Sequence, residues 1–283
     1  MFKIIEYPKV QDFFNKNKKT IYGNRLAHYH LIKYFEELNA GRQSIIQAYN
    51  ITDDDGGNVI AVWGDSVYYL YALKWSDAII DGLLNKIEIA KYTKRFTFCG
   101  TAELVLRLFE KSGVEKEIYK ERIIYSCDNL MPLVRSCNGE ACFSGSLDLD
   151  VIGEMYYQYG LEEWGEREGR DRDHARTIAL QGIQNETTCH WEVDGKIKTI
   201  ASILDDDSEM PIIGSLFTNI EDRGRGYAKC LVHEIASQLT AEDGSKCGII
   251  SDLHDPITNK MFTQIGFEEI SRYVSIHTTR ETV

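Results

Sequence analysis

The sequence predicts an α+β fold with a mixed α/β sheet, formed twice in tandem along the chain. Three observations predict it. Apolar runs typical of strands alternate with segments of helical periodicity in both halves. The order of these elements in the first half recurs in the second. The length of 283 residues exceeds what one compact core usually holds and indicates two domains of ordinary size.

The first element predicted in the first half is an amphipathic helix over residues 28–38, where Leu31, Phe35 and Leu38 recur at helical spacing. Three strands follow, and an acidic turn with two glycines at residues 53–57 separates the first two. A helix, a strand, a helix and a strand complete this half. The seven ranges are 44–52, 59–63 and 67–73, then 77–90, 95–99, 102–111 and 117–127.

The second half repeats this order after a joint between Asn129 and Leu147, where three small residues and Gly139 relax the chain. Two helices come first, and a hairpin with an Asp194-Gly195 turn follows them. The helices are expected at 148–161, 172–184, 229–239 and near Asn259, and the strands at 188–193, 198–204, 211–218, 247–253 and 268–277. The predicted domains are residues 1–135 and 136–283.

The most informative segment joins the strand at 211–218 to the helix at 229–239, and it reads Arg223-Gly224-Arg225-Gly226-Tyr227-Ala228. The start of a helix presents free backbone N–H groups at its positive dipole end. Glycine lets the main chain approach an anion without a Cβ in the way, and Arg223 and Arg225 add charge at the rim. The segment predicts a pyrophosphate site, the alternative being a glycine-rich turn without a ligand.

A second pattern follows downstream. The run at 247–253 leads to Asn259 in a short helix, then to Ile265-Gly266-Phe267 and the final strand. Together the two patterns resemble the GNAT superfamily of acyl-CoA-dependent N-acyltransferases, and Leu216-Phe217-Thr218 with the glycine-rich segment is most similar to its FR47-like branch. The resemblance is clear over residues 187–283 and weaker over 148–186. It implies two GNAT-like units and acetyl-CoA as the acyl donor.

The resemblance also implies roles for individual residues. In the superfamily, the strand before the phosphate turn offers main-chain N–H groups to the thioester carbonyl and the pantetheine arm. Leu216, Phe217 and Thr218 match that strand, and the side chains of Leu216 and Phe217 are also expected in the core. Asn259 matches an Asn that hydrogen-bonds the pantetheine arm. The alternative for Asn259 is a helix N-cap.

Phe262 departs from the pattern. Many relatives carry Tyr there, and its phenol protonates the leaving sulfur, whereas Phe262 has no proton to give. A water or the hydroxyl of Ser215, Thr218 or Thr263 takes that role, or CoA leaves as the thiolate. The catalytic base is not identified by the sequence. The candidates are Glu154, Glu162, Glu163, Glu166, His190 and Glu192, each of which is also explained as a surface group.

The first unit has Lys74-Trp75-Ser76-Asp77-Ala78 where the second has its glycine-rich turn. Such a segment cannot cradle a pyrophosphate in the same way, because no glycine brings the main chain close to the anion. The first unit is therefore predicted to be a degenerate copy that binds no CoA. It is expected to shape the acceptor side or the packing between domains.

Composition narrows the class of protein. A net charge of -12 and a pI near 5.1 argue against a nucleic-acid binder, which needs clustered Lys and Arg.

Seven scattered cysteines without a Cys-x-x-Cys pair predict neither a disulfide nor a zinc site, and they are typical of a reducing compartment. No apolar window is long enough for a membrane span, and the lysine-rich start lacks the apolar core of a signal peptide. The expected location is the cytoplasm.

The function predicted from the sequence is transfer of an acetyl group from acetyl-CoA to a primary amine of a small molecule or peptide, directly within a ternary complex. No metal, nucleic acid or membrane takes part, and a homodimer is one of the assemblies left open. The alternative is a non-catalytic acyl-CoA-binding or regulatory module. A nucleotide-phosphate binder is a third reading, which the absence of a Lys-Ser/Thr pair after the glycines disfavours.

Overall fold

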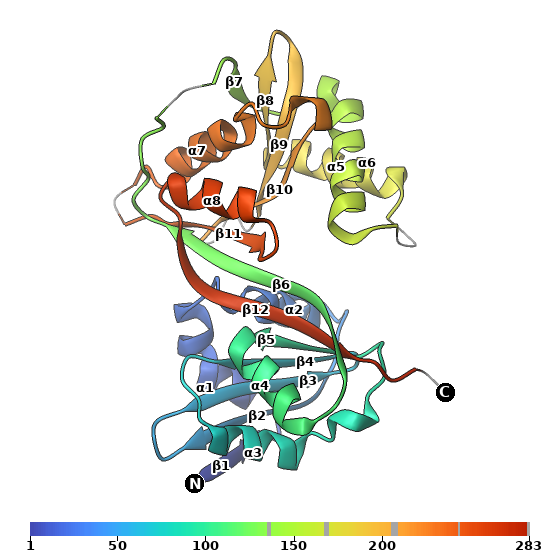
Figure 1. Cartoon of the computed structure of the whole chain (residues 1–283), viewed down its shortest axis with the longest axis vertical. Helices are drawn as coiled ribbons and strands as arrows, with labels where there is room; N and C mark the ends of the chain where they lie inside the picture. The colour runs from blue at the N-terminus through green and yellow to red at the C-terminus, as the bar shows by residue number, and fades with distance from the viewer. Residues whose placement is uncertain (135–136, 167–169, 205–208, 243, 282–283) are drawn as a thin grey trace. The chain divides into compact units, whose positions relative to one another are not determined.

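The computed structural model describes residues 1–134, 137–166, 170–204, 209–242 and 244–281 (Figure 1). These residues form two compact units, each with a mixed sheet flanked by helices. The first unit contains residues 1–124, 252–254 and 270–283, and the second contains residues 125–251 and 255–269. The boundary predicted between residues 135 and 136 lies outside the described residues and stays a prediction.

The first unit has the strand order β1-β2-β3-β4-β5-β12. The antiparallel strands are β1 (Phe2–Glu6), β2 (Ile45–Asp53), β3 (Asn58–Gly64) and β4 (Val67–Ala72), and β5 (Thr97–Thr101) then runs parallel to β4. The helices are α1 (Val10–Gly23), α2 (Tyr29–Asn39), α3 (Asp77–Lys86) and α4 (Ala102–Ser112), with a short 3₁₀ turn at Ile89–Lys91. The elements expected in this half are confirmed, although α3 ends earlier than predicted.

Successive side chains of β4 pack on opposite faces of the sheet. Tyr68 stacks on Phe98, which packs edge-on against Phe109 of α4. Its neighbour Tyr69 points to the other face and packs on Tyr34 of α2. The helices therefore cover both faces of this sheet, α3 and α4 one of them and α1 and α2 the other (Figure 1).

The second unit contains a sheet with the order β11-β10-β9-β8-β7. Its strands are β7 (Glu140–Phe143), β8 (Thr188–Val193), β9 (Lys196–Leu204), β10 (Ile212–Thr218) and β11 (Cys247–Asp252). Its helices are α5 (Leu149–Trp164), α6 (Arg172–Gln184), α7 (Tyr227–Leu239) and α8 (Pro256–Gln264), with 3₁₀ turns at Ser146–Asp148 and Ile220–Asp222. The joint expected at 129–147 therefore contains an edge strand, β7, that the sequence analysis missed.

The core of the second unit fixes the face on which α5 and α6 lie. Phe217 and Ile200 pack with Ile152 and Met155 of α5. Tyr156 is buried, and its hydroxyl oxygen lies 2.9 Å from Thr188 Oγ1 and 2.5 Å from Ser202 Oγ. The aromatic side chain of Tyr156 is therefore part of this core.

The last strand, β12 (Glu268–Thr278), completes the sheet of the first unit. It pairs antiparallel with β5 from Tyr273 opposite Thr101 to His277 opposite Thr97. Val274 and Ile276 are buried in the core of the first unit. The chain thus enters the second unit along β6 (Lys116–Cys127) and returns to the first unit with residues 252–254 and 270–283.

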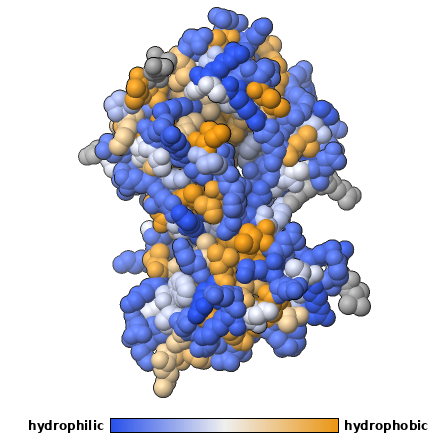
Figure 2. Space-filling model, in the orientation of Figure 1, coloured by the Kyte–Doolittle hydropathy of each residue, from blue (hydrophilic) through white to orange (hydrophobic). Residues whose placement is uncertain are grey.

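Figure 2 shows a mostly hydrophilic face on which apolar residues are scattered in small groups. In the part of the chain that the structure describes, each helix is too short or too polar to span a bilayer.

Buried histidine is expected to make folding stability pH-dependent. His30 of α2 packs against the Tyr273 ring at 4.4 Å, and burial with nearby Arg122 lowers its pKa from 6.5 to about 4. The unfolded chain therefore binds a proton that the folded protein excludes between those values, and stability falls as pH drops through that window. We expect this residue to account for a loss of roughly 2 to 3 kcal/mol in urea unfolding between pH 6.5 and pH 4.

His30→Phe, which keeps an aromatic ring against Tyr273, should flatten that part of the pH profile. His174→Gln, at an exposed position on α6, should leave it unchanged and serves as the control. Parallel profiles for wild type and His30→Phe would contradict the assignment.

Candidate functional site

The strands β10 and β11 diverge inside the second unit. Their parallel pairing covers Ile212 opposite Gly248 and Ile213 opposite Ile249, and the described pairing stops there. On its other side β10 has a register shift against β9 between Gly214 and Phe217, and Ser215 in this bulge has a φ of 49°. A non-glycine residue in the left-handed region is uncommon and marks a bulge that redirects the main chain. The segment Ser215 to Thr218 therefore runs along an opening between two parallel strands.

The glycine-rich turn lies at the end of this strand and leads into α7. Residues 223–226 are exposed, whereas Tyr227 is buried and anchors the helix start. Gly226 is the N-cap with a φ of 88°, and the first helical hydrogen bond runs from Cys230 N–H to Gly226 O. The N–H groups of Tyr227, Ala228 and Lys229 precede that bond, so they point out of the helix end. This is an anion-binding arrangement with the positive dipole end exposed.

The two arginines of the turn are bound to acidic partners. Arg223 donates to both carboxylate oxygens of Glu162 at 2.7 and 2.8 Å and to the Thr218 carbonyl at 3.0 Å. Arg225 forms an ion pair with buried Asp222 at 3.4 Å, and Lys198 shares that carboxylate at 3.2 Å. The arginines therefore stabilise the conformation of the turn, and their positive charge is partly neutralised.

Helix α8 contains the other two predicted residues. Its N-cap is Asp255, whose carboxylate accepts hydrogen bonds from the N–H groups of Ile257 and Thr258, and Pro256 occupies the first helical position. The N-cap alternative for Asn259 is therefore wrong, since Asn259 lies within the helix and is half-buried. Lys229 of α7 donates to Gln264 of α8 at 3.0 Å.

Phe262 is a core residue of the second unit. Its ring packs 5.9 Å from Tyr125 and 6.0 Å from Phe267, and the residue is 3% exposed. Phe262→Tyr should lower the free energy of unfolding by about 1 to 3 kcal/mol, because it buries a hydroxyl among aromatic rings. Urea unfolding measures this loss, and a variant as stable as the wild type would contradict the burial of this position.

The candidate bases lie on the face covered by α5 and α6 or close to it. Glu154 is paired with Arg172 and Glu162 with Arg223. His190 is buried, and its Nδ1 lies 2.9 Å from Ser144 Oγ while its Nε2 lies 3.8 Å from Glu192 Oε2. Burial lowers the pKa of His190, so its imidazole is neutral near pH 7. The sequence analysis named His190 and Glu192 separately, and the structure adds Ser144 to them.

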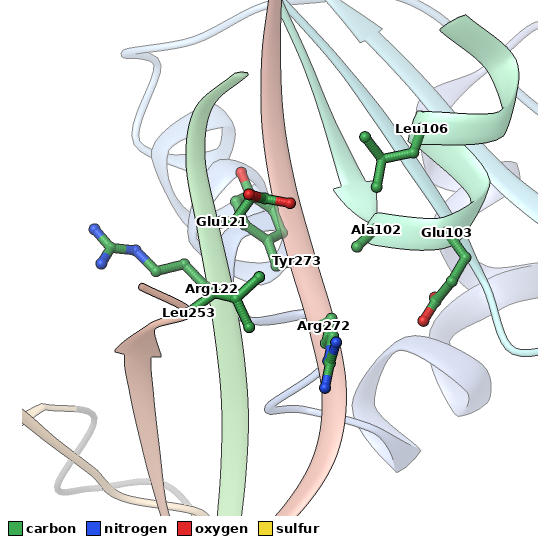
Figure 3. Close-up of a pocket in the computed structure, with 8 residues that line it drawn as sticks. All are labelled: Ala102, Glu103, Leu106, Glu121, Arg122, Leu253, Arg272 and Tyr273. Carbon is green, nitrogen blue, oxygen red and sulfur yellow. The ribbon is translucent and has the colours of Figure 1, made fainter. Parts of the chain in front are cut away.

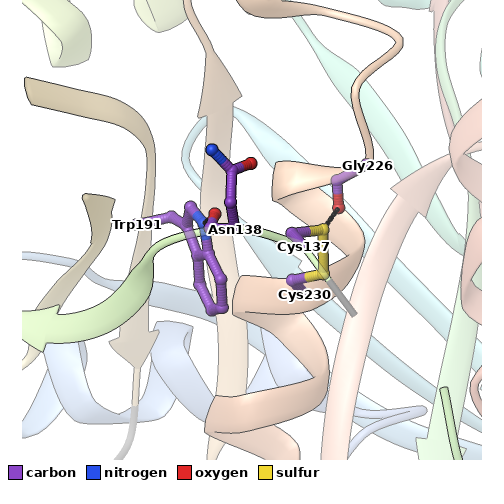
Figure 4. Close-up of a disulfide and its surroundings, with 5 residues drawn as sticks. All are labelled: Cys137, Asn138, Trp191, Gly226 and Cys230. Atoms are coloured by element: carbon purple, nitrogen blue, oxygen red, sulfur yellow. Dashed lines mark hydrogen bonds between the residues drawn. A yellow bond between two sulfur atoms is a disulfide. The ribbon is translucent and has the colours of Figure 1, made fainter. Parts of the chain in front are cut away.

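A disulfide joins Cys137 to Cys230, with Cα atoms 6.3 Å apart (Figure 4). The expectation that no disulfide forms is wrong, because β7 and α7 bring together residues 93 positions apart in the sequence. Cys230 lies in the first turn of α7, directly after the glycine-rich turn. The cysteines at 99, 127, 189 and 247 are buried thiols, as expected for small core residues.

The first unit differs at the corresponding strand and helix. Its β4 and β5 stay paired over four positions, from Val67 opposite Thr97 to Leu70 opposite Gly100. The Thr101 side chain bridges the end of this pair through hydrogen bonds with the N–H and carbonyl of Ala72. The described pairing thus shows no opening comparable to that between β10 and β11.

The start of α3 is acidic. Asp53 accepts hydrogen bonds from the hydroxyl of the N-cap residue Ser76 and from Gly57 N–H, both at 2.6 Å, and these bonds lower its pKa. Asp77 follows in the first turn. A phosphate at this helix end would meet the carboxylates of Asp53 and Asp77, the second of which is paired with Arg107.

The first unit also contains a cavity of about 130 Å³ (Figure 3). Its volume is below the range of about 300 to 1,000 Å³ that is usual for ligand pockets. Its wall mixes charged and apolar side chains from α4, β6, β12 and the segment after β11, namely Ala102, Glu103, Leu106, Glu121, Arg122, Leu253, Arg272 and Tyr273. Two of the charged residues are already paired, Arg122 with Asp252 and Glu121 with His254.

Comparison with known proteins gives one family and a consistent fold. Residues 193–276 match the family described as FR47-like protein. An acetyltransferase from the GNAT family of Colwellia psychrerythraea is 11% identical, with 98% of this chain and 99% of that chain covered and a TM-score of 0.59. The GCN5-related N-acetyltransferase from Sphaerobacter thermophilus is 14% identical, with 100% and 97% covered and a TM-score of 0.60. No curated protein sequence matches the chain.

Proposed function

The chain has the GNAT fold, and we propose that its second unit transfers an acetyl group from acetyl-CoA to a primary amine of a small molecule or peptide. One observation carries the proposal. The opening beside the β10 bulge ends at the exposed, glycine-rich start of α7, so one continuous surface offers main-chain donors for an elongated anion with a thioester tail.

The residues present fit that donor. The N–H groups of Tyr227, Ala228 and Lys229 would bind the pyrophosphate, with no Cβ at Gly226 to obstruct it. The main chain of Leu216, Phe217 and Thr218 would bind the pantetheine arm in the opening, and Asn259 of α8 would hydrogen-bond it from the other side. Acetyl-CoA supplies the activated acyl group.

Catalysis would rest on positioning and on main-chain donors at the bulge. N–H groups fixed along Ser215 to Thr218 would stabilise the charge that develops on the thioester oxygen, and holding the amine beside it would supply proximity. General acid help is typically worth about 10² to 10⁴ in rate, so the reaction would proceed without a phenol at 262, with water or the hydroxyl of Ser215, Thr218 or Thr263 supplying the proton.

Thiol release from acetyl-CoA in the presence of a panel of amines tests the proposal. We expect amine-dependent release together with calorimetric binding of one acetyl-CoA per chain, because the start of α3 repels a second. Binding without release for every amine would favour the alternative, a non-catalytic acyl-CoA-binding module. The absence of a phenol at position 262 is consistent with that alternative. No binding at all would refute both.

A further inference from the structure

We propose that the Cys137–Cys230 disulfide is a redox switch for acetyl-CoA binding, and that the oxidised form binds more tightly. The inference rests on the proposed function, because it concerns the same helix start. It would make the affinity of the second unit depend on the thiol–disulfide state of its surroundings.

The disulfide supports the turn that would bind the pyrophosphate. Cys137 Sγ lies 3.2 Å from the carbonyl oxygen of Gly226, the same oxygen that accepts the first helical hydrogen bond from Cys230 N–H at 3.0 Å (Figure 4). A disulfide sulfur has no proton to donate, so this approach is a van der Waals contact, and the covalent link from Cys137 to Cys230 places it against the first turn of α7. Gly226 therefore lies against a sulfur atom that the disulfide fixes in place.

The other end of the bridge is attached to the sheet. Trp191 Nε1 of β8 donates to the Asn138 carbonyl at 2.9 Å, and a Cβ placed on Gly139 would lie only 2.1 Å from the Glu192 carbonyl oxygen. From residue 140 onward the segment continues as β7, paired with β8. Cys137 is thus the end of a fixed segment, so the disulfide ties the start of α7 to the edge of the sheet.

The position of the disulfide determines whether it raises or lowers the affinity for acetyl-CoA. Helix carbonyls point toward the C-terminal end and N–H groups toward the N-terminal end. The sulfur at Cys137 contacts the Gly226 carbonyl, so it lies on the flank of the first turn and leaves the N–H groups of Tyr227, Ala228 and Lys229 open. The bond therefore preorganises the donors without covering them, and preorganisation raises affinity.

Reduction would proceed from the Cys137 side. Cys137 is half-buried, whereas Cys230 is 3% exposed. One thiolate of a dithiol attacks Cys137 Sγ and expels the Cys230 thiolate, and the second thiol then displaces Cys137. Two electrons and two protons pass to the protein, giving two cysteine thiols and one cyclic disulfide of the reductant. The separated sulfurs no longer link the first turn of α7 to the segment of Cys137, and the turn loses that covalent support.

Calorimetric titration with acetyl-CoA of the whole protein, oxidised and after reduction with dithiothreitol, tests the switch. Acetyl-CoA is the probe because free CoA carries a thiol that could itself reduce the bond. We expect about a tenfold weaker Kd after reduction. Cys137→Ser should bind like the reduced protein and ignore the reductant, whereas Cys142→Ser, at a free cysteine, should keep the full response.

A second readout separates the switch from a general loss of stability. Binding linkage is reciprocal, so saturating acetyl-CoA should shift the dithiol concentration that half-reduces the disulfide by the same factor, about tenfold. If Cys137→Ser unfolds at the assay temperature, the switch is tested by the Kd values of the oxidised and reduced wild type together with this shift in dithiol concentration. Equal Kd values in both wild-type forms, or tighter binding after reduction, would overturn the switch alone. Absence of binding in every form would overturn the proposed function and the switch with it.

Discussion

Gly226→Val should abolish acetyl-CoA binding while the second unit stays folded. Gly226 has a φ of 88° and caps α7, so a branched side chain there would stand where the pyrophosphate must approach the helix N–H groups. A Cβ would also come within 3.4 Å of Cys137 Sγ. We expect at least about a 100-fold rise in Kd by calorimetry, corresponding to roughly 2.7 kcal/mol.

Gly244→Val is the matched control for this change. Gly244 follows the far end of α7, has a φ of 83°, and has open space around its Cα. Valine there imposes similar backbone strain, so any effect of strain alone appears in both variants. If Gly226→Val retains wild-type affinity, the pyrophosphate does not bind at this turn. Circular dichroism of both variants shows whether the fold is intact.

Gly100→Ala should cause the largest loss of stability in the first unit. Gly100 of β5 has a φ of 141°, and a Cβ there would lie 1.8 Å from the carbonyl oxygen of Leu70 and 2.6 Å from its carbonyl carbon on β4. Because both atoms are backbone, the clash can be relieved only by separating two paired strands. We expect a loss of more than about 4 kcal/mol in urea unfolding, at the far end of what single substitutions cause.

Gly113→Ala provides the comparison. Gly113 also has a positive φ, 68°, at the end of α4, yet nothing lies within 4 Å of an added Cβ. It should cost only about 1 kcal/mol, since alanine there suffers backbone strain without a clash. Equal losses of unfolding free energy in the two variants would contradict this prediction, because β4 and β5 could then separate without penalty. The difference in strand pairing between β4–β5 and β10–β11 would then have no energetic meaning.

The sequence alone predicted those elements whose pattern lies in consecutive residues. The strand, turn and helix from residue 211 to 239 follow from consecutive residues, and the structure has them in that order. The N-cap of α8 was also readable, because Asp255-Pro256 is a cap followed by a proline at the first helical position. The alternative that Asn259 is the N-cap overlooked that signal.

The missed helix α1 shows a different limit. Its buried positions are Phe13, Asn17 and Ile21, at a helical spacing of four residues, but the central one is polar. Asn17 is accommodated by a reciprocal amide pair with Asn50 of β2, at 2.9 and 3.0 Å. An apolar periodicity cannot reveal a buried position whose partner lies 33 residues away on another element.

The candidate site was limited in the same way. Arg223 was predicted at the rim of the turn from the local pattern, but its partner Glu162, 61 residues earlier, was not. Neither could it pair Cys137 with Cys230, because cysteine spacing carries no information about which strands and helices become neighbours. The chemistry of the turn is local, whereas its support comes from distant segments.

The return of β12 to the first sheet has a consequence for how the protein is made. The first unit lacks the strand beside β5 until residues 270–281 have left the ribosome, although β1 to β5 end by residue 101 and the part of β6 that belongs to this unit ends at residue 124. At about 5 to 20 residues per second, the nascent chain would hold an uncovered β5 edge for roughly 10 to 30 seconds while the second unit is synthesised. The unit translated first is therefore completed last, and an early stop within the final strand would harm the beginning of the protein more than its middle.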